Sequence, residues 1–309
     1  MSNKKEVQIP FIQQFAAGAV AGISEILVMY PLDVVKTRLQ LQRGPGSGST
    51  HYAGMLDCFR KVIRHEGPSR LYRGILAPIL MEAPKRATKF AANDSWSSFY
   101  RRALAAPAVT QPLAVLTGAS AGATEALVVV PFELVKIRLQ DAAHAARYRG
   151  AADVVAHVVR ADGLRGLYQG FESTVWRHIV WNAGYFGCIF QIRAALPPAE
   201  SKGQKVRNDL LAGGLGGTVG TLLNTPLDVV KSRIQSAERV KGVVPKYNWT
   251  WPAVATVWRE EGTRALYKGL LPKLARFCPG GGILLVVYTA VVEVFQKIEV
   301  ARKGEVKAE

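Results

Sequence analysis

The sequence repeats itself three times, and this repetition constrains the fold more than any other feature. A ten-residue motif, Pro-x-acid-x-x-Lys-x-Arg-x-Gln, begins at Pro31, Pro131 and Pro226. Two landmarks recur in phase with it: an acid-Gly pair at Glu66, Asp162 and Glu261, and a Tyr-x-Gly triplet at Tyr72, Tyr168 and Tyr267. Self-similarity of this kind indicates copies of one structural unit. We place the three copies at residues 1–102, 103–200 and 201–309.

Each copy contains two apolar segments of roughly the length that crosses a membrane, about 20 residues. The first segments cover residues 11–30, 113–130 and 210–225, and the second cover residues 74–92, 170–191 and 269–295. Pairs of glycines four residues apart, such as Gly18 and Gly22, allow close helix packing in lipid. The pattern predicts an all-α membrane protein with six transmembrane helices and both termini on one side.

A polar segment separates the two apolar segments of each copy. It shows the apolar periodicity of an amphipathic helix, for example at Met55, Phe59, Val62 and Ile63. A helix of this kind lies in the plane of the membrane surface rather than across it. We therefore expect one short surface helix in each copy.

The composition excludes several other classes of protein. The net charge is +17 but 49% of the residues are hydrophobic, which is too apolar for a disordered basic protein. The basic residues follow the repeat instead of clustering with stacking aromatics, which argues against nucleic-acid binding. The cysteines stand singly and no phosphate loop or nucleophile elbow occurs. The sequence predicts neither an enzyme nor a metal or cofactor site.

The three motifs and their landmarks resemble the mitochondrial carrier family over essentially the whole chain. The resemblance implies a six-helix bundle with pseudo-threefold symmetry and short helices on the matrix surface. It also implies a multi-pass protein of the inner mitochondrial membrane that acts as a monomer, binds cardiolipin, and transports by alternating access through one central site. No cofactor is implied.

The resemblance assigns the charged residues of the motif to a gate on the matrix side. It pairs Asp33 with Lys136, Glu133 with Lys231, and Asp228 with Lys36, and it makes Gln40, Gln140 and Gln235 braces of these pairs. The opposite, cytoplasmic gate retains a single possible pair, Asp94 with Arg193. We therefore expect the unliganded protein to rest open to the cytoplasm.

Charges inside the second apolar segments indicate the substrate site. Counting seven residues from the Tyr-x-Gly glycines gives Met81, Arg177 and Arg276, which threefold symmetry places at one depth. Cations there cost at least a few kcal/mol unless they face water or a partner, and Glu82 is the one acid in an equivalent layer. The further candidate ligands are Glu82, Lys85, Arg86, Lys89, His178, Trp181 and Asn182. Two guanidiniums suit the bidentate binding of a dicarboxylate.

Within the family, Arg177-His178 and Arg276-Phe-Cys, with the run at residues 78–90, resemble the 2-oxodicarboxylate carriers. This implies exchange of 2-oxoadipate or 2-oxoglutarate across the inner membrane. The alternative is a carrier of citrate or another di- or tricarboxylate, because the same cations accept a third carboxylate. The role of Glu25 and Glu125 stays open between proton coupling and a structural hydrogen bond to a neighbouring helix.

Overall fold

The computed structural model describes residues 10–42, 51–105, 108, 110–143, 147–198, 201–238 and 244–305. These residues form helices and turns and contain no β-strand. Each copy has the same order of elements, a long helix, a surface helix, a short turn of helix and a second long helix, and in the third copy the second long helix is divided in two. The predicted all-α class is confirmed.

The helix bounds follow the three copies along the chain. The first copy contains α1 (Phe11–Leu41), α2 (Met55–Glu66), η1 (Pro68–Tyr72) and α3 (Leu76–Ala103). The second contains α4 (Gln111–Gln140), α5 (Ala151–Asp162), η2 (Leu164–Tyr168) and α6 (Phe171–Ala195). The third contains α7 (Lys202–Ser236), α8 (Thr250–Glu261), α9 (Thr263–Leu266), α10 (Leu270–Ala275) and α11 (Phe277–Glu305). The last predicted membrane segment is thus divided at Arg276.

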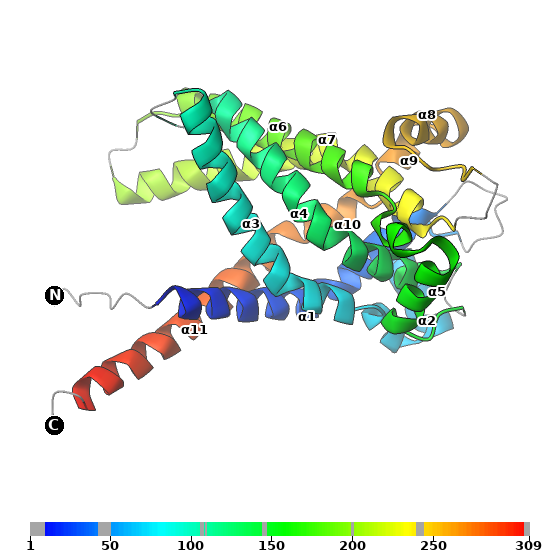
Figure 1. Ribbon diagram of the computed structural model, residues 1–309, viewed down its shortest axis with the longest axis horizontal. Coiled ribbons are helices and arrows are strands. Elements are labelled where there is room, and N and C mark those ends of the chain that lie inside the picture. The colour runs from blue at the N-terminus through cyan, green and yellow to red at the C-terminus, as the bar shows by residue number, and fades with distance from the viewer. Residues whose placement is uncertain are drawn as a thin grey trace.

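The long helices form a bundle that is narrow at one end and wide at the other (Figure 1). Two helix pairs from adjacent copies pack most extensively, α6 along α7 and α3 along α4, followed by α4 with α6 of its own copy and α11 along α1. The surface helices lie at the narrow end, whereas α1 begins and α11 ends at the wide end, where α11 diverges from α7. The bundle is therefore closed beside α2, α5 and α8 and splayed at the opposite end.

The motif prolines lie inside the first long helix of each copy, at Pro31 in α1, Pro131 in α4 and Pro226 in α7. A proline inside a helix removes one backbone hydrogen bond and bends the helix. The motif acid follows two residues later, so that it lies just beyond the bend. This arrangement brings the acids of all three copies to the closed end of the bundle.

Each surface helix packs on the end of the long helix that precedes it. The buried apolar residues are spaced by four: Cys58 and Val62 in α2, Val154 and Val158 in α5, and Ala253 and Val257 in α8. The landmark glycines explain the turns on either side, since all six have positive φ, from 70° at Gly163 to 88° at Gly67. An L side chain rarely adopts this conformation. The landmarks thus fix how the surface helix returns to the bundle.

Length and apolar composition alone identify fewer membrane spans than the repeat does. In the described part of the chain, Ile12–Leu41, Gln111–Gln140 and Thr263–Glu299 are long and apolar enough to cross a membrane. Helices α3, α6 and α7 fall short because charged, polar and glycine residues interrupt them.

Candidate functional site

Three ion pairs lie at the closed end of the bundle, and each joins two different copies. Lys136 Nζ lies 2.8 Å from Asp33 Oδ2, Lys231 donates to Glu133, and Lys36 Nζ lies 3.7 Å from Asp228 Oδ2. These are the partners assigned to the matrix gate from the sequence. Since every pair crosses a boundary between copies, the copies cannot separate at this end without breaking all three.

The motif glutamines lie beside these ion pairs without bridging them. Gln40 accepts a hydrogen bond from Ser232 Oγ over 2.8 Å, which joins α1 to α7. The side-chain amides of Gln140 and Gln235 are buried and have no hydrogen-bond partner. In the described residues, no hydrogen bond connects any of the three to a gate ion pair. The predicted braces are therefore disengaged in this conformation.

Arg276 is neutralised by two carboxylates of α1. Its Nη1 donates to Asp33 Oδ1 over 2.6 Å, and its Nη2 donates to Glu25 Oε1 over 2.8 Å. The sequence interpretation recognised only Glu82 as an acid in an equivalent layer, and this was wrong. The packing of α11 along α1 brings together residues separated by more than 240 positions in the sequence. Both terminal nitrogens of this guanidinium therefore donate to an acid of α1.

Arg177 has no comparable partner. Its guanidinium lies 4.0 Å from both Glu133 and Asp228, so that neither contact is a hydrogen bond. Its Nη2 lies 3.2 Å from His178 Nε2, and its Nε is buried without a hydrogen-bond partner. Of the two arginines, Arg177 thus retains more unused donors.

Sequence reasoning missed Lys273, on α10. Its Nζ lies 2.5 Å from Asp228 Oδ2, the same oxygen that Lys36 approaches only to 3.7 Å. One signal was available: Lys273 precedes Arg276 by three residues and therefore lies on the same face, one turn away. Asp228 is consequently shared between a lysine of its own copy and a lysine of the first copy.

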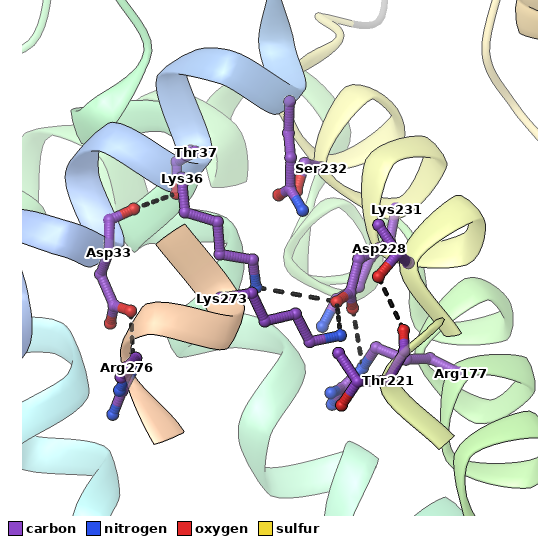
Figure 2. A network of polar contacts seen from close by, with 12 residues as sticks. Asp33, Lys36, Thr37, Arg177, Thr221, Asp228, Lys231, Ser232, Lys273 and Arg276 are labelled. Carbon is purple, nitrogen blue, oxygen red and sulfur yellow. Dashed lines mark hydrogen bonds and ion pairs between the residues drawn. The ribbon is translucent and has the colours of Figure 1, made fainter. Parts of the chain in front are cut away.

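These contacts form two ionic networks, which differ in charge, and Figure 2 labels most residues of the first of them. In the first, two carboxylates face four cations: Glu133 and Asp228 with Lys36, Arg177, Lys231 and Lys273. In the second, two carboxylates face two cations: Glu25 and Asp33 with Lys136 and Arg276. Among the described ion pairs, the first network has two positive charges in excess and the second is balanced. The excess is centred on Arg177 and Asp228.

Glu82, Lys85 and Arg86 form a separate group on α3. The Glu82 side chain is buried and accepts from Lys85 Nζ and from Arg86 Nε, each over 2.6 Å. This group packs against Gly22 of α1, and Met81 beside it is also buried. Lys89 is exposed. Of the predicted ligands on α3, Met81, Glu82, Lys85 and Arg86 thus take part in or lie beside helix packing, whereas Lys89 is exposed.

The remaining predicted ligands orient α6. His178 packs on Gly122 of α4, and Asn182 Nδ2 donates to Gly118 O of α4 over 3.3 Å. The ring of Trp181 stacks on Tyr185, with centroids 4.9 Å apart. The contacts of His178 and Asn182 hold α6 close to α4, whereas the stack of Trp181 on Tyr185 lies within α6.

The two residues predicted to close the cytoplasmic side do not meet. Asp94 is exposed, and Arg193 Nη2 instead lies 2.9 Å from Asp209 Oδ1 of α7. Both members of that pair are about half exposed, at 55% and 50%. The wide end of the bundle therefore lacks the ion pair that was predicted to close it. Within the described residues, no group of three potential metal ligands occurs.

Comparison with known proteins agrees with this architecture. The family model described as "Mitochondrial carrier protein" matches residues 7–104, 109–199 and 202–299, once for each copy. The chain is 65% identical to the mitochondrial citrate transporter D of Aspergillus niger over 300 residues, which cover 96% of this chain and 98% of that protein.

Other relatives carry a different description. A probable mitochondrial 2-oxodicarboxylate carrier of Schizosaccharomyces pombe is 56% identical over 94% of this chain and 96% of its own length. The mitochondrial 2-oxodicarboxylate carrier of Homo sapiens is 40% identical over 93% of this chain and 96% of its own length. The chain is therefore a transporter of the inner mitochondrial membrane, and it belongs to the mitochondrial carrier family.

Proposed function

We propose that this protein exchanges 2-oxodicarboxylates, chiefly 2-oxoadipate and 2-oxoglutarate, across the inner mitochondrial membrane. The observation that carries the proposal is the excess of two positive charges in the network around Arg177 and Asp228. A dicarboxylate supplies two negative charges and neutralises this excess. The relatives named 2-oxodicarboxylate carriers support the same substrate class.

In the proposed complex, Arg177 receives one carboxylate of the substrate. Its guanidinium has unused donors in a planar fork, which matches a carboxylate in a bidentate arrangement. The second carboxylate competes with Glu25 and Asp33 for Arg276. His178, which faces Arg177, is placed to donate to the keto oxygen when its Nε2 carries the proton.

Alternating access follows from the connection between the site and the matrix gate. Arg177 and Arg276 contact Glu133, Asp228 and Asp33, which are the acids of the gate. A dianion that draws the arginines away leaves these acids with fewer cations and changes the strength of the closed gate. The energy of substrate binding is in this way available to open the matrix side.

A second substrate class is supported by a specific observation, the 65% identity to a citrate transporter. Citrate carries three carboxylates at neutral pH, one more than the charge excess of the network. We keep a di- and tricarboxylate exchanger as the alternative function of the same site. Cardiolipin binding at the landmark turns and function as a monomer are further parts of the proposal.

The experiment is exchange in liposomes that contain the purified protein. Vesicles are preloaded with 2-oxoadipate, 2-oxoglutarate, citrate, malate or buffer, and uptake of labelled 2-oxoglutarate is measured. We expect the two oxodicarboxylates to drive the fastest uptake and unloaded vesicles to show none. Uptake driven best by citrate would transfer the assignment to the alternative, and uptake into unloaded vesicles would contradict exchange.

A further inference from the structure

Two buried polar side chains of α7 have no counterpart in the other copies. Thr221 and Asn224 lie five and two residues before the motif proline of α7, and they are 0% and 2% exposed. The equivalent residues are buried but apolar: Ile26 and Met29 in α1, and Ala126 and Val129 in α4. Burial of a polar group is unfavourable unless the group finds a hydrogen-bond partner. This turn of α7 therefore carries polar groups that the shared architecture of the copies does not require.

The oxygens of these two side chains lack partners within the protein. Thr221 Oγ1 and Asn224 Oδ1 are buried, and no hydrogen bond reaches either atom in the described part of the chain. Thr225 shows the contrast, because its hydroxyl donates to Thr221 O of the same helix over 2.7 Å. Buried polar atoms without partners are uncommon in folded proteins, and each of them is costly. Two on one turn of a helix indicate a place where a ligand supplies the missing partners.

The packing of α6 on α7 places this turn beside Arg177. A short connection joins the two helices, which therefore run antiparallel, and a Cβ on Gly220 of α7 would lie 3.2 Å from Trp181 O of α6. Four residues back along α6 and four residues forward along α7, the same register sets Arg177 opposite Asn224. The contact of Arg177 Nε with Asp228 Oδ1 at 4.0 Å, one turn further along α7, agrees with this register.

The guanidinium contributes a third atom without a partner, since Arg177 Nε is buried and receives no hydrogen bond in the described residues. Figure 2 shows Thr221 among the residues of the network around Arg177 and Asp228. His178 packs on Gly122 of α4 and belongs to the opposite side of α6. The turn of α7 is therefore a feature separate from the histidine that the proposed function assigns to the keto oxygen.

The three atoms require a group that both donates and accepts. Arg177 Nε only donates, Asn224 Oδ1 only accepts, and the hydroxyl of Thr221 can do either. A keto or carboxylate oxygen only accepts, so that it would leave Asn224 Oδ1 without a donor. A hydroxyl group donates to Asn224 and accepts from Thr221 and Arg177. It is the single substituent that satisfies all three atoms.

We propose that Thr221 and Asn224 form a subsite for a hydroxyl group of the substrate, on the carbon next to the carboxylate that Arg177 binds. The hydroxyl donates to Asn224 Oδ1 and accepts from Thr221 Oγ1. The chemical class that fits is the 2-hydroxydicarboxylates, which the protein exchanges in addition to 2-oxodicarboxylates. This inference rests on the proposed function, to which it adds a second class of substrate at the same site.

The test compares five-carbon dicarboxylates that differ only at carbon 2. Exchange of labelled 2-oxoglutarate in liposomes is measured with glutarate or with either enantiomer of 2-hydroxyglutarate as the external competitor. For the unmodified protein we expect the better enantiomer to have an inhibition constant at least about tenfold below that of glutarate. Vesicles preloaded with this enantiomer should also take up labelled 2-oxoglutarate, which shows that it is transported as well as bound.

Variants of the subsite are compared through the ratio of the two inhibition constants. This ratio does not depend on how much of the reconstituted protein is active. Thr221→Val and Asn224→Leu replace polar groups by apolar groups of similar shape, so that each should lower the ratio and the double variant should bring it close to unity. Thr221→Ser retains the hydroxyl and should preserve the ratio. Thr218→Val is the matched control, because the hydroxyl that it removes already donates to Gly214 O over 2.9 Å.

Each outcome either supports the inference or overturns it. Equal inhibition by glutarate and by both enantiomers in the unmodified protein overturns it and leaves the proposed function standing. A ratio that survives in the double variant does the same, and indicates that this turn of α7 serves only the packing of α6. If the double variant does not fold, the single variants and the unmodified protein decide. Absence of 2-oxoglutarate exchange in the unmodified protein overturns the proposed function as well.

Discussion

Lys273 lies 2.5 Å from Asp228, nearer than Lys36, which completes the gate pair with the same carboxylate oxygen at 3.7 Å. Lys273 and Asp228 belong to one copy, whereas Lys36 belongs to another. When the first and third copies separate, Asp228 therefore keeps a cation. Lys273 shares Asp228 with Lys36 and thereby weakens the ion pair between Lys36 and Asp228. Less free energy is then needed to break this ion pair when the gate opens.

This relationship predicts the effect of Lys273→Gln. Without competition, Lys36 approaches Asp228 and the closed gate becomes more stable, so that the exchange rate falls while the KM for 2-oxoglutarate changes little. A change of about 1 kcal/mol in the closed state corresponds to about a fivefold change in rate. Initial rates of exchange over a range of substrate concentrations give both quantities.

The control for this prediction is Arg264→Gln, which removes an exposed cation from the neighbouring turn. Lys273→Arg should restore most of the rate, because it retains a cation beside Asp228. A rise in KM with an unchanged maximal rate in Lys273→Gln would contradict the gate role and indicate a direct substrate contact.

The two arginines should differ in their effect on stability. Arg276→Ala removes two hydrogen-bonded ion pairs and leaves Glu25 and Asp33 with fewer partners, so that the melting temperature falls. Arg177→Ala loses two ion pairs of 4.0 Å and one contact with His178, an adjacent residue of the same helix, and should melt closer to the unmodified protein. Both should lose exchange. Thermal unfolding in detergent and exchange in liposomes separate the two effects.

A double-mutant cycle checks the pair between Arg276 and Glu25. Adding Glu25→Gln to Arg276→Ala removes a carboxylate that would otherwise be unpaired, so that the double variant should recover part of the lost melting temperature. Additive effects of the two substitutions would show that the contact contributes nothing to the fold.

Glycines on one face of α1 should differ in their tolerance of a methyl group. A Cβ at position 22 would lie 2.3 Å from Glu82 Oε1 and 2.7 Å from Arg86 Nη2, whereas nothing lies within 4 Å of one at position 18. Gly22→Ala must displace the paired ends of Glu82 and Arg86 and should destabilise the protein by about 1 kcal/mol. Gly18→Ala is the control and should change stability by less than about 0.5 kcal/mol. Equal melting temperatures of the two variants would contradict the close packing of α3 on α1.

The stability of the protein should fall in acid in part because of Glu261, which lies at the end of the surface helix α8. Burial alone would raise the pKa of Glu261, but hydrogen bonds and the charges of Arg233 and Lys268 hold the pKa below its usual value. The stabilisation is therefore complete above the unfolded-state pKa of about 4.3 and is lost as pH falls through the lower folded-state pKa.

Glu261→Gln should lower stability at neutral pH by about 3 kcal/mol, because the Arg233 guanidinium is buried and loses its bidentate partner. Its melting temperature should then vary less than that of the unmodified protein as the pH falls. Glu260→Gln breaks an exposed pair with Lys246 and should cost less than about 1 kcal/mol. Parallel pH profiles for Glu261→Gln and the unmodified protein would contradict the assignment.

The sequence predicts the architecture because the repeat encodes it locally. The prolines, the acid-Gly pairs and the Tyr-x-Gly triplets each determine a bend or a turn within a few residues of themselves, as the positive φ of Gly67 and Gly74 shows. The division of the last long helix at Arg276 was not predicted, although Pro279 and the three glycines that follow it are a local signal close to the break.

The candidate site was less predictable because its contacts join distant helices. The pair of Arg276 with Glu25 and the sharing of Asp228 by Lys273 depend on how α11 and α10 approach α1 and α7. The predicted pair of Asp94 with Arg193 is not formed in this structure, where Arg193 contacts Asp209 instead. The symmetry of the three copies predicts which charged residues lie at the same depth along the bundle. It does not predict which residue of another helix each of them contacts.

The central claim, that the network around Arg177 binds a dianion, is tested most directly by the stabilisation that ligands confer. The melting temperature of the purified protein is measured with 2-oxoadipate, 2-oxoglutarate and the monocarboxylate 2-oxohexanoate, for the unmodified protein and for Arg177→Ala. At a hundredfold excess over Kd, a bound ligand stabilises by about 2.7 kcal/mol. We predict that both dicarboxylates clearly raise the melting temperature of the unmodified protein and that 2-oxohexanoate does not. None of the three ligands should raise the melting temperature of Arg177→Ala. An equal rise with the monocarboxylate, or a full rise in Arg177→Ala, would contradict the account.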